Sequence, residues 1–407
     1  MYGLLTGMRV VEAASFVAGP SCGLHLAQMG VEVIRIDPIG GGPDFHRWPR
    51  AGGGGGSLYW EGLNKGKKSI AIDLARPEGR DLALEIATAG GAEAGLFVTN
   101  YPVGGFLAHQ RLAARRADII TLRIMGWPDG RSAVDYTVNA AVGVPYMTGP
   151  ADATGPVNHI LPAWDLMAGA YGAFALVAAE RSRRQTGRGQ EIRLPLSDLA
   201  IATLGHLGQI GEVITSGADR PRMGNDLYGA FGRDFATRDG RRLMVVAITA
   251  RQWTGLVAAL GLDAEIAALE EELEVDFGRD EGLRFQHRDR LHPLFERAFA
   301  GADSGTLLAE FATKGVCFAP YQGLKEATSG DPAFTPLNPL LAAIRHPSGA
   351  TYPAPGAAAT LAGETRAPPH PAPRLGADTD WVLAERLGLT AAAIGALHDR
   401  GLVAGPA

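Results

Sequence analysis

The sequence predicts an α/β fold: a doubly wound, Rossmann-like large domain joined by long linkers to a smaller α+β domain. Over the first 200 residues, short apolar runs typical of buried strands alternate with helix-like segments. Beyond about residue 226 the pattern changes to a hairpin followed by amphipathic helices. The chain has 407 residues, of which 46% are hydrophobic and 20% charged, as expected for a globular protein of two or three domains.

The expected strands of the large domain are short and rich in valine, isoleucine and leucine. They are Met8–Ala14, Val31–Ile36, Ser69–Leu74, Gly95–Thr99, Ile119–Ile124 and Glu191–Pro195. Helices are expected between and after them, at Leu24–Met29 (preceded by a turn over residues 18–23), Pro77–Thr88, Ala163–Arg184 and Leu196–Ile214. Strands that alternate with helices in this way form a mostly parallel sheet.

Composition shifts suggest three regions along the chain. Residues 1–216 form the large domain, and a polar stretch, Gly217–Asn225, leads out of it. Residues 226–325 form the small domain, with a strand at Leu243–Ala247 and helices at Trp253–Leu260 and His292–Ala300. Residues 326–407 contain a proline- and alanine-rich linker and then two helices, Thr379–Leu387 and Thr390–His398, that return to the large domain.

Charge and cysteine content argue against several classes of protein. The net charge of −5 and the pI near 6.1 do not suit a binder of nucleic acid or of anionic membranes. Cys22 and Cys317 are too few for a disulfide framework or a cysteine-based zinc site, as expected for a cytoplasmic protein. The most apolar helical stretch, Leu166–Ala179, is too short to span a membrane.

The common catalytic motifs do not occur. There is no G-x-G-x-x-G after the first strand, no G-x-x-x-x-G-K-[ST], no G-x-S-x-G and no H-E-x-x-H, and no histidines show metal-ligand spacing. We therefore expect no metal. The run Gly52–Gly56 is compatible with a phosphate-cradling loop, but a surface loop is the more frequent role of such a run.

Lysines are rare and clustered. Of the 38 lysines and arginines five are lysine, and Lys65, Lys67 and Lys68 fall within four residues. Arg35 and Asn100 stand at the ends of other expected strands, and the carboxyl ends of parallel strands border the ligand crevice. Together these residues suggest a cationic rim for a polyphosphate ligand. The alternative for the lysines is a solvated turn.

Asp165 is a lone carboxylate at the start of a long apolar helix. Aspartate is a favoured helix-capping residue, so from spacing alone a capping role is the more frequent interpretation. The second interpretation is a nucleophile, because a carboxylate that is desolvated and well placed attacks acyl groups.

The whole chain resembles the family III CoA-transferases. The segments that carry this resemblance are Leu5–Glu12, Ala18–Pro20, Gly30–Asp37, Leu63–Leu74, Asp165–Gln190 and Arg374–Asp380. The resemblance implies that Asp165 is the catalytic aspartate and that the chain forms an interlocked homodimer. It also implies that coenzyme A enters as part of the substrate, with no permanently bound cofactor. The residues that it assigns to CoA binding are Val17, Ala18, Arg35, Asn64, Lys65, Lys67 and Asn100.

Within the family the chain resembles the branch that moves CoA between the C1 and C4 carboxyl groups of mesaconate. The segments are Phe16–Ala18, Arg35–Gly42, Arg47–Pro49, Val134–Asn139, Asn158–His159, Pro162–Asp165 and Leu227–Phe235. This implies transfer within one molecule, through an anhydride and an aspartyl-CoA thioester on Asp165. The alternatives are an intermolecular acyl-CoA:dicarboxylate CoA-transferase and a non-enzymatic CoA-binding protein.

Departures from the family pattern refine the expectation. The racemase branch needs proton-transfer groups where this chain has Val134 and Thr249, so racemase activity is disfavoured. No Gly-Gly-Gly-Gly-Gln loop occurs after residue 200, which suits a closed pocket that retains the free acid. The family's Arg-Pro-Gly after Asn100 is replaced by Tyr101–Gly105, so Arg47 or Arg50 is a candidate for that phosphate contact.

Overall fold

The computed structural model describes residues 1–52, 55–91 and 93–406, and the chain forms two compact units. The first unit comprises Met1–Val142, Ile160–Thr215 and Asp331–Ala407, and the second comprises Gly143–His159 and Ser216–Gly330. Residues 143–159 therefore group with the second unit, whereas the sequence predicts them in the large domain. The glycine run 52–56 lies partly outside the described residues.

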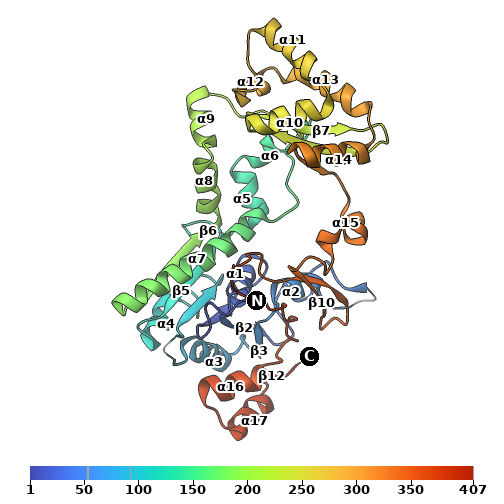
Figure 1. The fold of residues 1–407 in the computed structure, drawn as a ribbon. Helices are drawn as coiled ribbons and strands as arrows, with labels where there is room; N and C mark the ends of the chain where they lie inside the picture. The colour runs from blue at the N-terminus through green and yellow to red at the C-terminus, as the bar shows by residue number, and fades with distance from the viewer. Residues whose placement is uncertain (53–54, 92, 407) are drawn as a thin grey trace. The chain divides into compact units, whose positions relative to one another are not determined.

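A seven-stranded sheet forms the centre of the first unit (Figure 1), in the order β12-β3-β2-β1-β4-β5-β6. Its strands are β1 (Arg9–Ala13), β2 (Glu32–Pro38), β3 (Lys68–Ile72), β4 (Leu96–Thr99), β5 (Ile120–Met125), β6 (Gln190–Pro195) and β12 (Val403–Ala404). All neighbouring pairs are parallel except β12–β3. The predicted mixed α/β fold with a mostly parallel sheet is confirmed.

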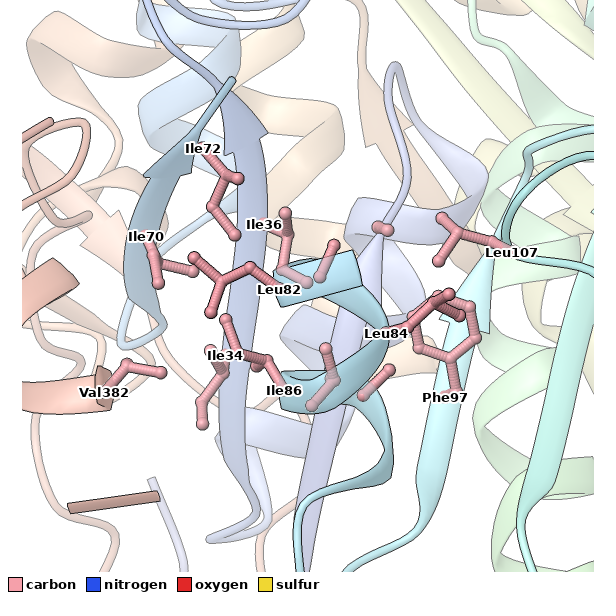
Figure 2. Close-up of a cluster of buried hydrophobic side chains, with 14 of the residues drawn as sticks. Ile34, Ile36, Ile70, Ile72, Leu82, Leu84, Ile86, Phe97, Leu107 and Val382 are labelled. Atoms are coloured by element: carbon pink, nitrogen blue, oxygen red, sulfur yellow. The ribbon is translucent and has the colours of Figure 1, made fainter. Parts of the chain in front are cut away.

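Strands β1 to β5 are largely buried because helices cover them. The helices of this unit are α1 (Ala18–Gln28), α2 (Leu58–Leu63), α3 (Pro77–Thr88), α4 (His109–Arg115), α5 (Asp135–Ala141), α7 (Ala163–Thr186), α8 (Leu196–His206) and α9 (Gln209–Ser216), then η2 (Pro332–Phe334), α16 (Thr379–Leu387) and α17 (Ala391–Asp399). Figure 2 shows Leu82 and Ile86 of α3 packed against Ile34, Ile36 and Ile70 of the sheet. Helix α1 packs on α7 and on β1 and β2.

Two expected elements of the first unit differ clearly from the structure. Helix α1 begins at Ala18, whereas residues 18–23 were expected to form a turn. Gly19 allows this early start, because a Cβ there would lie 2.3 Å from the Cβ of Ala14, and Pro20 is tolerated in a first helical turn. The expected helix Leu196–Ile214 is divided into α8 and α9 at Gly208, whose φ of +76° is left-handed.

The C-terminal segment of the first unit continues the sheet. The two-stranded pair β10 (Leu341–Arg345) and β11 (Thr351–Pro355) precedes α16. Asp378 accepts a hydrogen bond from the Ser69 amide, and Thr379 accepts one from the Ala71 amide. These contacts attach the chain end to β3, and β12 then pairs with the same strand.

The second unit has its own core around a three-stranded antiparallel sheet. The strands β7 (Phe231–Ala236), β8 (Arg242–Ala247) and β9 (Cys317–Pro320) pair in that order. Its helices are α6 (Val144–Met147), α10 (Ala250–Leu260), α11 (Asp263–Leu273), α12 (Glu281–Gln286), α13 (Arg288–Ala300), α14 (Ser304–Lys314) and α15 (Leu324–Gly330). Buried phenylalanines, among them Phe235 and Phe295, fill the space between sheet and helices. No described helix has the length and apolar character needed to cross a membrane.

Candidate active site

A cavity of about 950 Å³ opens in the first unit beyond the carboxyl ends of β1, β4 and β5. In parallel α/β sheets this edge is where ligands bind. The cavity is lined by Ser15–Ala18, Arg47, Trp48, Tyr59, Asn100–Val103, Arg123–Gly126, Pro128–Tyr136, Ile160, Pro162, Asp165, Arg193 and Leu196. Its volume is at the upper end of the usual range for small-molecule sites.

Asp165 projects into this cavity from the first turn of α7, and it does not cap the helix. The capping group is Asp135, whose Oδ2 accepts the amide hydrogens of Trp164 (2.7 Å) and Asp165 (3.1 Å). No described residue donates a hydrogen bond to the Asp165 carboxylate. The capping interpretation of Asp165 is therefore wrong, and its carboxylate is free to meet a ligand.

The environment of Asp165 favours its neutral form. Burial in the cavity wall is the main cause, and the nearby Asp135 carboxylate adds to it, so that the pKa of Asp165 is raised to about 7. Arg47 acts in the opposite direction and lowers this pKa. A carboxyl group poised near neutrality in a cavity is typical of a functional site.

Phe16 borders the same cavity in a strained backbone conformation. Its φ is +70°, in the left-handed region that residues with side chains rarely adopt. Its amide donates to Oδ2 of the buried Asp44 (3.1 Å), which helps to hold this conformation. The Arg47 guanidinium lies 5.5 Å from the centre of the Phe16 ring and 5.3 Å from that of Tyr59.

Three of the seven residues assigned to CoA binding share the cavity with Asp165. Val17 and Ala18 line it where α1 begins, and Asn100 lines it after β4. The Asn100 amide also fixes the loop after β1: its Nδ2 donates to the Ser15 carbonyl (3.1 Å) and its Oδ1 accepts the Ser15 amide (3.3 Å). These residues therefore form one continuous wall.

Arg35, Asn64 and Lys67 lie elsewhere, inside a buried ionic network. Arg35 contacts Asp37 (2.9 Å), Asp44 (3.0 Å) and Glu12 (3.2 Å), and its side chain is 0% exposed. Lys67 Nζ donates to Glu12 (2.8 Å), to the Pro20 carbonyl (2.8 Å) and to Asn64 Oδ1 (2.9 Å).

The carboxylates of this network determine how its cations behave. Burial alone would lower the pKa of Arg35, but Asp37, Asp44 and Glu12 together raise it. Burial lowers the pKa of Lys67, and Glu12 offsets part of that effect. The expected cationic rim is not formed by these side chains, because internal carboxylates neutralise them. The alternative interpretation, a solvated turn, is also wrong for Lys67, because this side chain is buried.

Lys65 lines a second, smaller cavity of about 380 Å³ in the same unit. Its Nζ donates to the Gly62 carbonyl, and burial together with the charge of Lys67 lowers its pKa to about 8. His346 and Tyr352 lie in the same cavity wall, with their rings stacked at 4.4 Å. The lysines of the cluster therefore have three environments, since Lys68 lies over the ring of Trp381 (3.8 Å).

Sequence reasoning missed the acidic partners in this region. Glu12 stands in the apolar strand β1, directly opposite Arg35 of β2. A charged residue inside a buried strand requires a partner, so Glu12 in this apolar run was a signal for a buried cation beside it. Asp44 gave no such signal, because it lies in the irregular, glycine-rich stretch after β2.

Val134 and Thr249 stand where the racemase branch needs proton-transfer groups. Val134 is exposed directly before α5. Thr249 caps α10 in the second unit, where its hydroxyl accepts the Gln252 amide.

Within residues 1–52, 55–91 and 93–406, no group of three or more histidine, cysteine, aspartate or glutamate side chains is placed to hold a metal ion.

The chain is similar to characterised enzymes of CoA transfer. It is 47% identical to 2-methylfumaryl-CoA isomerase of Chloroflexus aurantiacus, over 100% of this chain and 99% of that one. It is 27% identical to succinyl-CoA:glutarate CoA-transferase of Mus musculus, over 98% of this chain and 90% of that one.

Structural comparison agrees with the sequence comparison. The crystal structure of a CAIB/BAIF family protein from Brucella suis superposes with a TM-score of 0.73 at 25% identity, over 94% of this chain and 98% of that one. The family model for CoA-transferase family III matches residues 5–379. The site around Asp165, the fold and these matches agree, and the chain belongs to CoA-transferase family III.

Proposed function

We propose that the protein moves CoA between the C1 and C4 carboxyl groups of mesaconate, converting 2-methylfumaryl-CoA into 3-methylfumaryl-CoA. The observation that carries this proposal is the Asp165 carboxyl group, which projects into the large cavity and receives no hydrogen bond from the described residues. The full-length similarity to 2-methylfumaryl-CoA isomerase supports the choice of substrate. Coenzyme A takes part as a portion of the substrate.

The first half of the reaction transfers CoA to the enzyme. An ionised Asp165 oxygen attacks the C1 thioester carbonyl, the C–S bond breaks, and CoA leaves as the thiolate. The product is a mixed anhydride between Asp165 and C1 of mesaconate. The thiolate then attacks the Asp165 carbonyl carbon and expels the C1 carboxylate. Aspartyl-CoA thioester and mesaconate dianion result.

The second half repeats these steps at the other end of the acid. The C4 carboxylate attacks the aspartyl thioester and releases CoA thiolate, which leaves an anhydride with C4. The thiolate attacks the C4 carbonyl, and Asp165 departs as a carboxylate. No proton is gained or lost over the cycle, so the enzyme needs a positioned nucleophile and no separate base.

Each tetrahedral intermediate requires hydrogen-bond donors for its oxyanion. The segment Gly19–Gly23 lies within α1, where the later amides bond to carbonyls of the preceding turn. Because the first amide groups of a helix have no acceptor inside it, the amides at the start of α1 are better candidates. Val17 and Ala18 line the cavity there. A single such donor typically contributes about 3–4 kcal/mol to transition-state stabilisation.

Chromatography of mesaconyl-C1-CoA after incubation with the protein tests the proposal. We expect the C4 ester to accumulate to an equilibrium mixture with no added acid. Asp165→Asn should abolish the conversion, whereas Asp198→Asn, an exposed carboxylate on α8 outside the cavity lining, should not. Absence of the C4 ester with the wild-type protein would refute the proposed function.

The second candidate is an intermolecular transferase that exchanges the acid. The similarity to succinyl-CoA:glutarate CoA-transferase favours it, although that similarity is weaker. Such an enzyme requires a second dicarboxylic acid for turnover. Strict dependence of the rate on added acid would therefore replace the first proposal with the second.

We also propose that the chain works as a homodimer in the cytoplasm. Apolar side chains lie exposed along α7, α8 and α9, including Phe174 (67% exposed), Leu207 (66%) and Ile214 (76%). Several such residues on consecutive helices are typical of a protein–protein interface. Cys22 and Cys317 are both free thiols, as expected in a reducing compartment.

A further inference from the structure

The large cavity is lined by four arginines, and three of them already have acceptors. Arg123 donates to Glu191 (3.0 Å) and to the carbonyls of Tyr101 and Leu107. Arg193 also donates to Glu191 (2.9 Å). The third, the exposed Arg131, donates to Asp129 (2.7 Å).

Arg47 differs from the other three. Among the described residues, no carboxylate or carbonyl oxygen accepts a hydrogen bond from its guanidinium. Its contacts are the rings of Phe16 and Tyr59, at 5.5 and 5.3 Å. Ring faces attract the cation and restrict its position, yet they leave its N–H donors free for a ligand.

Arg47 is also close to the reacting group. Its charge acts on Asp165, and both residues line the same cavity. The neighbouring Phe16 is held in its strained conformation by Asp44, which is itself paired with the buried Arg35. The surface on which Arg47 lies is therefore fixed from inside the fold, which positions this cation before any ligand arrives.

We propose that Arg47 binds the free carboxylate of the acyl group, so that the site selects acyl-CoA esters of dicarboxylic acids. This inference rests on the proposed function and adds the group that recognises the substrate. A guanidinium donates two parallel hydrogen bonds to one carboxylate, which fixes both the distance and the plane of the acid. A carboxylate of the acyl group suits Arg47 better than the CoA phosphate suggested by the sequence, because the charge of Arg47 acts on the reacting Asp165 in the same cavity.

One arginine serves both halves of the reaction. Mesaconate carries a carboxylate at each end, so the C4 carboxylate lies on Arg47 while C1 reacts at Asp165. After the acid turns end for end, the C1 carboxylate lies on Arg47 while C4 reacts. The dianion released in between keeps a cationic partner throughout, which reduces its tendency to escape.

Binding measurements in the Asp165→Asn background test this role without chemistry. Calorimetry compares mesaconyl-C1-CoA with the CoA ester of (E)-2-methylbut-2-enoic acid, in which a methyl group replaces the free carboxylate. Adding Arg47→Gln should weaken binding of the mesaconyl ester about 10- to 100-fold, the usual effect of removing a charged hydrogen-bond partner. Binding of the methyl analogue should change less than about threefold.

Two further variants sharpen the comparison. Arg47→Lys keeps the charge without the planar pair of donors, so the preference for the mesaconyl ester should be intermediate. Arg50→Gln is the control, because Arg50 lies three residues after Arg47 in the chain and outside the cavity lining. Whatever its contact with CoA, it should leave the ratio of the two affinities unchanged.

The proposal is overturned if Arg47→Gln weakens both esters equally, or if it weakens neither. Failure of the proposed function gives a different pattern. In that case wild-type protein forms no C4 ester, while the preference for the mesaconyl ester over its methyl analogue still depends on Arg47.

Discussion

Asp165 in the first turn of α7 and Asp135 at the start of α5 are two neighbouring carboxylates, and their positions give them different roles. Asp135 lies 30 residues before Asp165 in the sequence and satisfies the first amides of α7. The Asp165 carboxylate accepts no hydrogen bond from the part of the chain that the structure describes, and it lies in a wall that disfavours its charge. Burial of this carboxylate lowers the stability of the fold and keeps the group available for reaction.

The raised pKa of Asp165 predicts that Asp165→Asn stabilises the protein at neutral and alkaline pH. The folded pKa is about 7 and the ordinary value is 3.8, so between them the folded state retains a proton that the unfolded state has lost. Stability therefore falls as pH rises through this window, and above it the full cost of the buried charge applies. Removing the charge should contribute about 1–3 kcal/mol at pH 8.

Thermal melts of the wild type and Asp165→Asn at pH 8 and pH 4 measure this effect. The variant should melt at a higher temperature at pH 8, and the difference should shrink towards pH 4, where both states of the wild type hold more of the proton. A variant that is less stable than the wild type at pH 8 would contradict the account.

The same group predicts the pH dependence of catalysis. Only the ionised form of Asp165 attacks a thioester, so kcat/KM should fall about tenfold per pH unit below a pKa near 7. Asp135→Asn removes the neighbouring negative charge while keeping a side chain that caps α7 well, so the profile should shift to lower pH. An unchanged profile in Asp135→Asn would contradict the contribution of the Asp135 charge and leave burial as the cause of the raised pKa.

At the scale of elements, β1, β2 and the turn before β3 are joined by the network of Glu12, Arg35 and Lys67. Arg35 lies opposite Glu12 on neighbouring strands, and Lys67 reaches the same carboxylate from the turn. Asp44 connects this interior to Phe16 at the cavity. The network therefore supports the loops that carry the site. Changes to it should lower the free energy of unfolding more than they weaken substrate binding.

Lys67→Met tests this structural role. It removes the buried cation but keeps the side chain's volume, leaving Glu12 with one fewer partner, and should cost about 3–5 kcal/mol. Lys68→Met is the matched control: this neighbour loses a contact with the Trp381 ring, which costs about 1 kcal/mol. Chemical denaturation measures the loss in free energy of unfolding for each variant. Equal losses in the two variants would contradict a stabilising role of the buried network.

The elements themselves were largely predictable, and the side-chain partnerships were not. Helix α3 has the predicted bounds, Pro77–Thr88, because a proline start and an amphipathic pattern are local signals. The start of α1 was missed, since the close packing of Gly19 on Ala14 depends on tertiary structure. The resemblance singled out Asp165, but the capping contact of Asp135 depends on two segments far apart in sequence.

At the scale of the whole molecule, the chain is built from two units that each have a core, and the first contains both cavities described here. The parallel sheet was predictable from the alternation of strands and helices. Its strand order, and the grouping of residues 143–159 with the second unit, depend on long-range contacts that no local pattern encodes.

The exposed apolar residues of α7–α9 lead to a prediction about assembly. Size-exclusion chromatography with light scattering should give about twice the chain mass of 42.7 kDa. Phe174→Asp combined with Ile214→Asp should shift the protein towards the monomer, whereas Leu337→Asp, also highly exposed but outside these helices, should not. A monomeric wild type at micromolar concentration would exclude the proposed dimer.

The central claim is that Asp165 transfers CoA within one mesaconate molecule. The most direct measurement is incubation of unlabelled mesaconyl-C1-CoA with an excess of ¹³C-labelled free mesaconate, followed by chromatography and mass spectrometry of the CoA esters. The account predicts rapid formation of unlabelled C4 ester, with label entering far more slowly than turnover. Label appearing in the esters at the turnover rate, or no C4 ester at all, would contradict it.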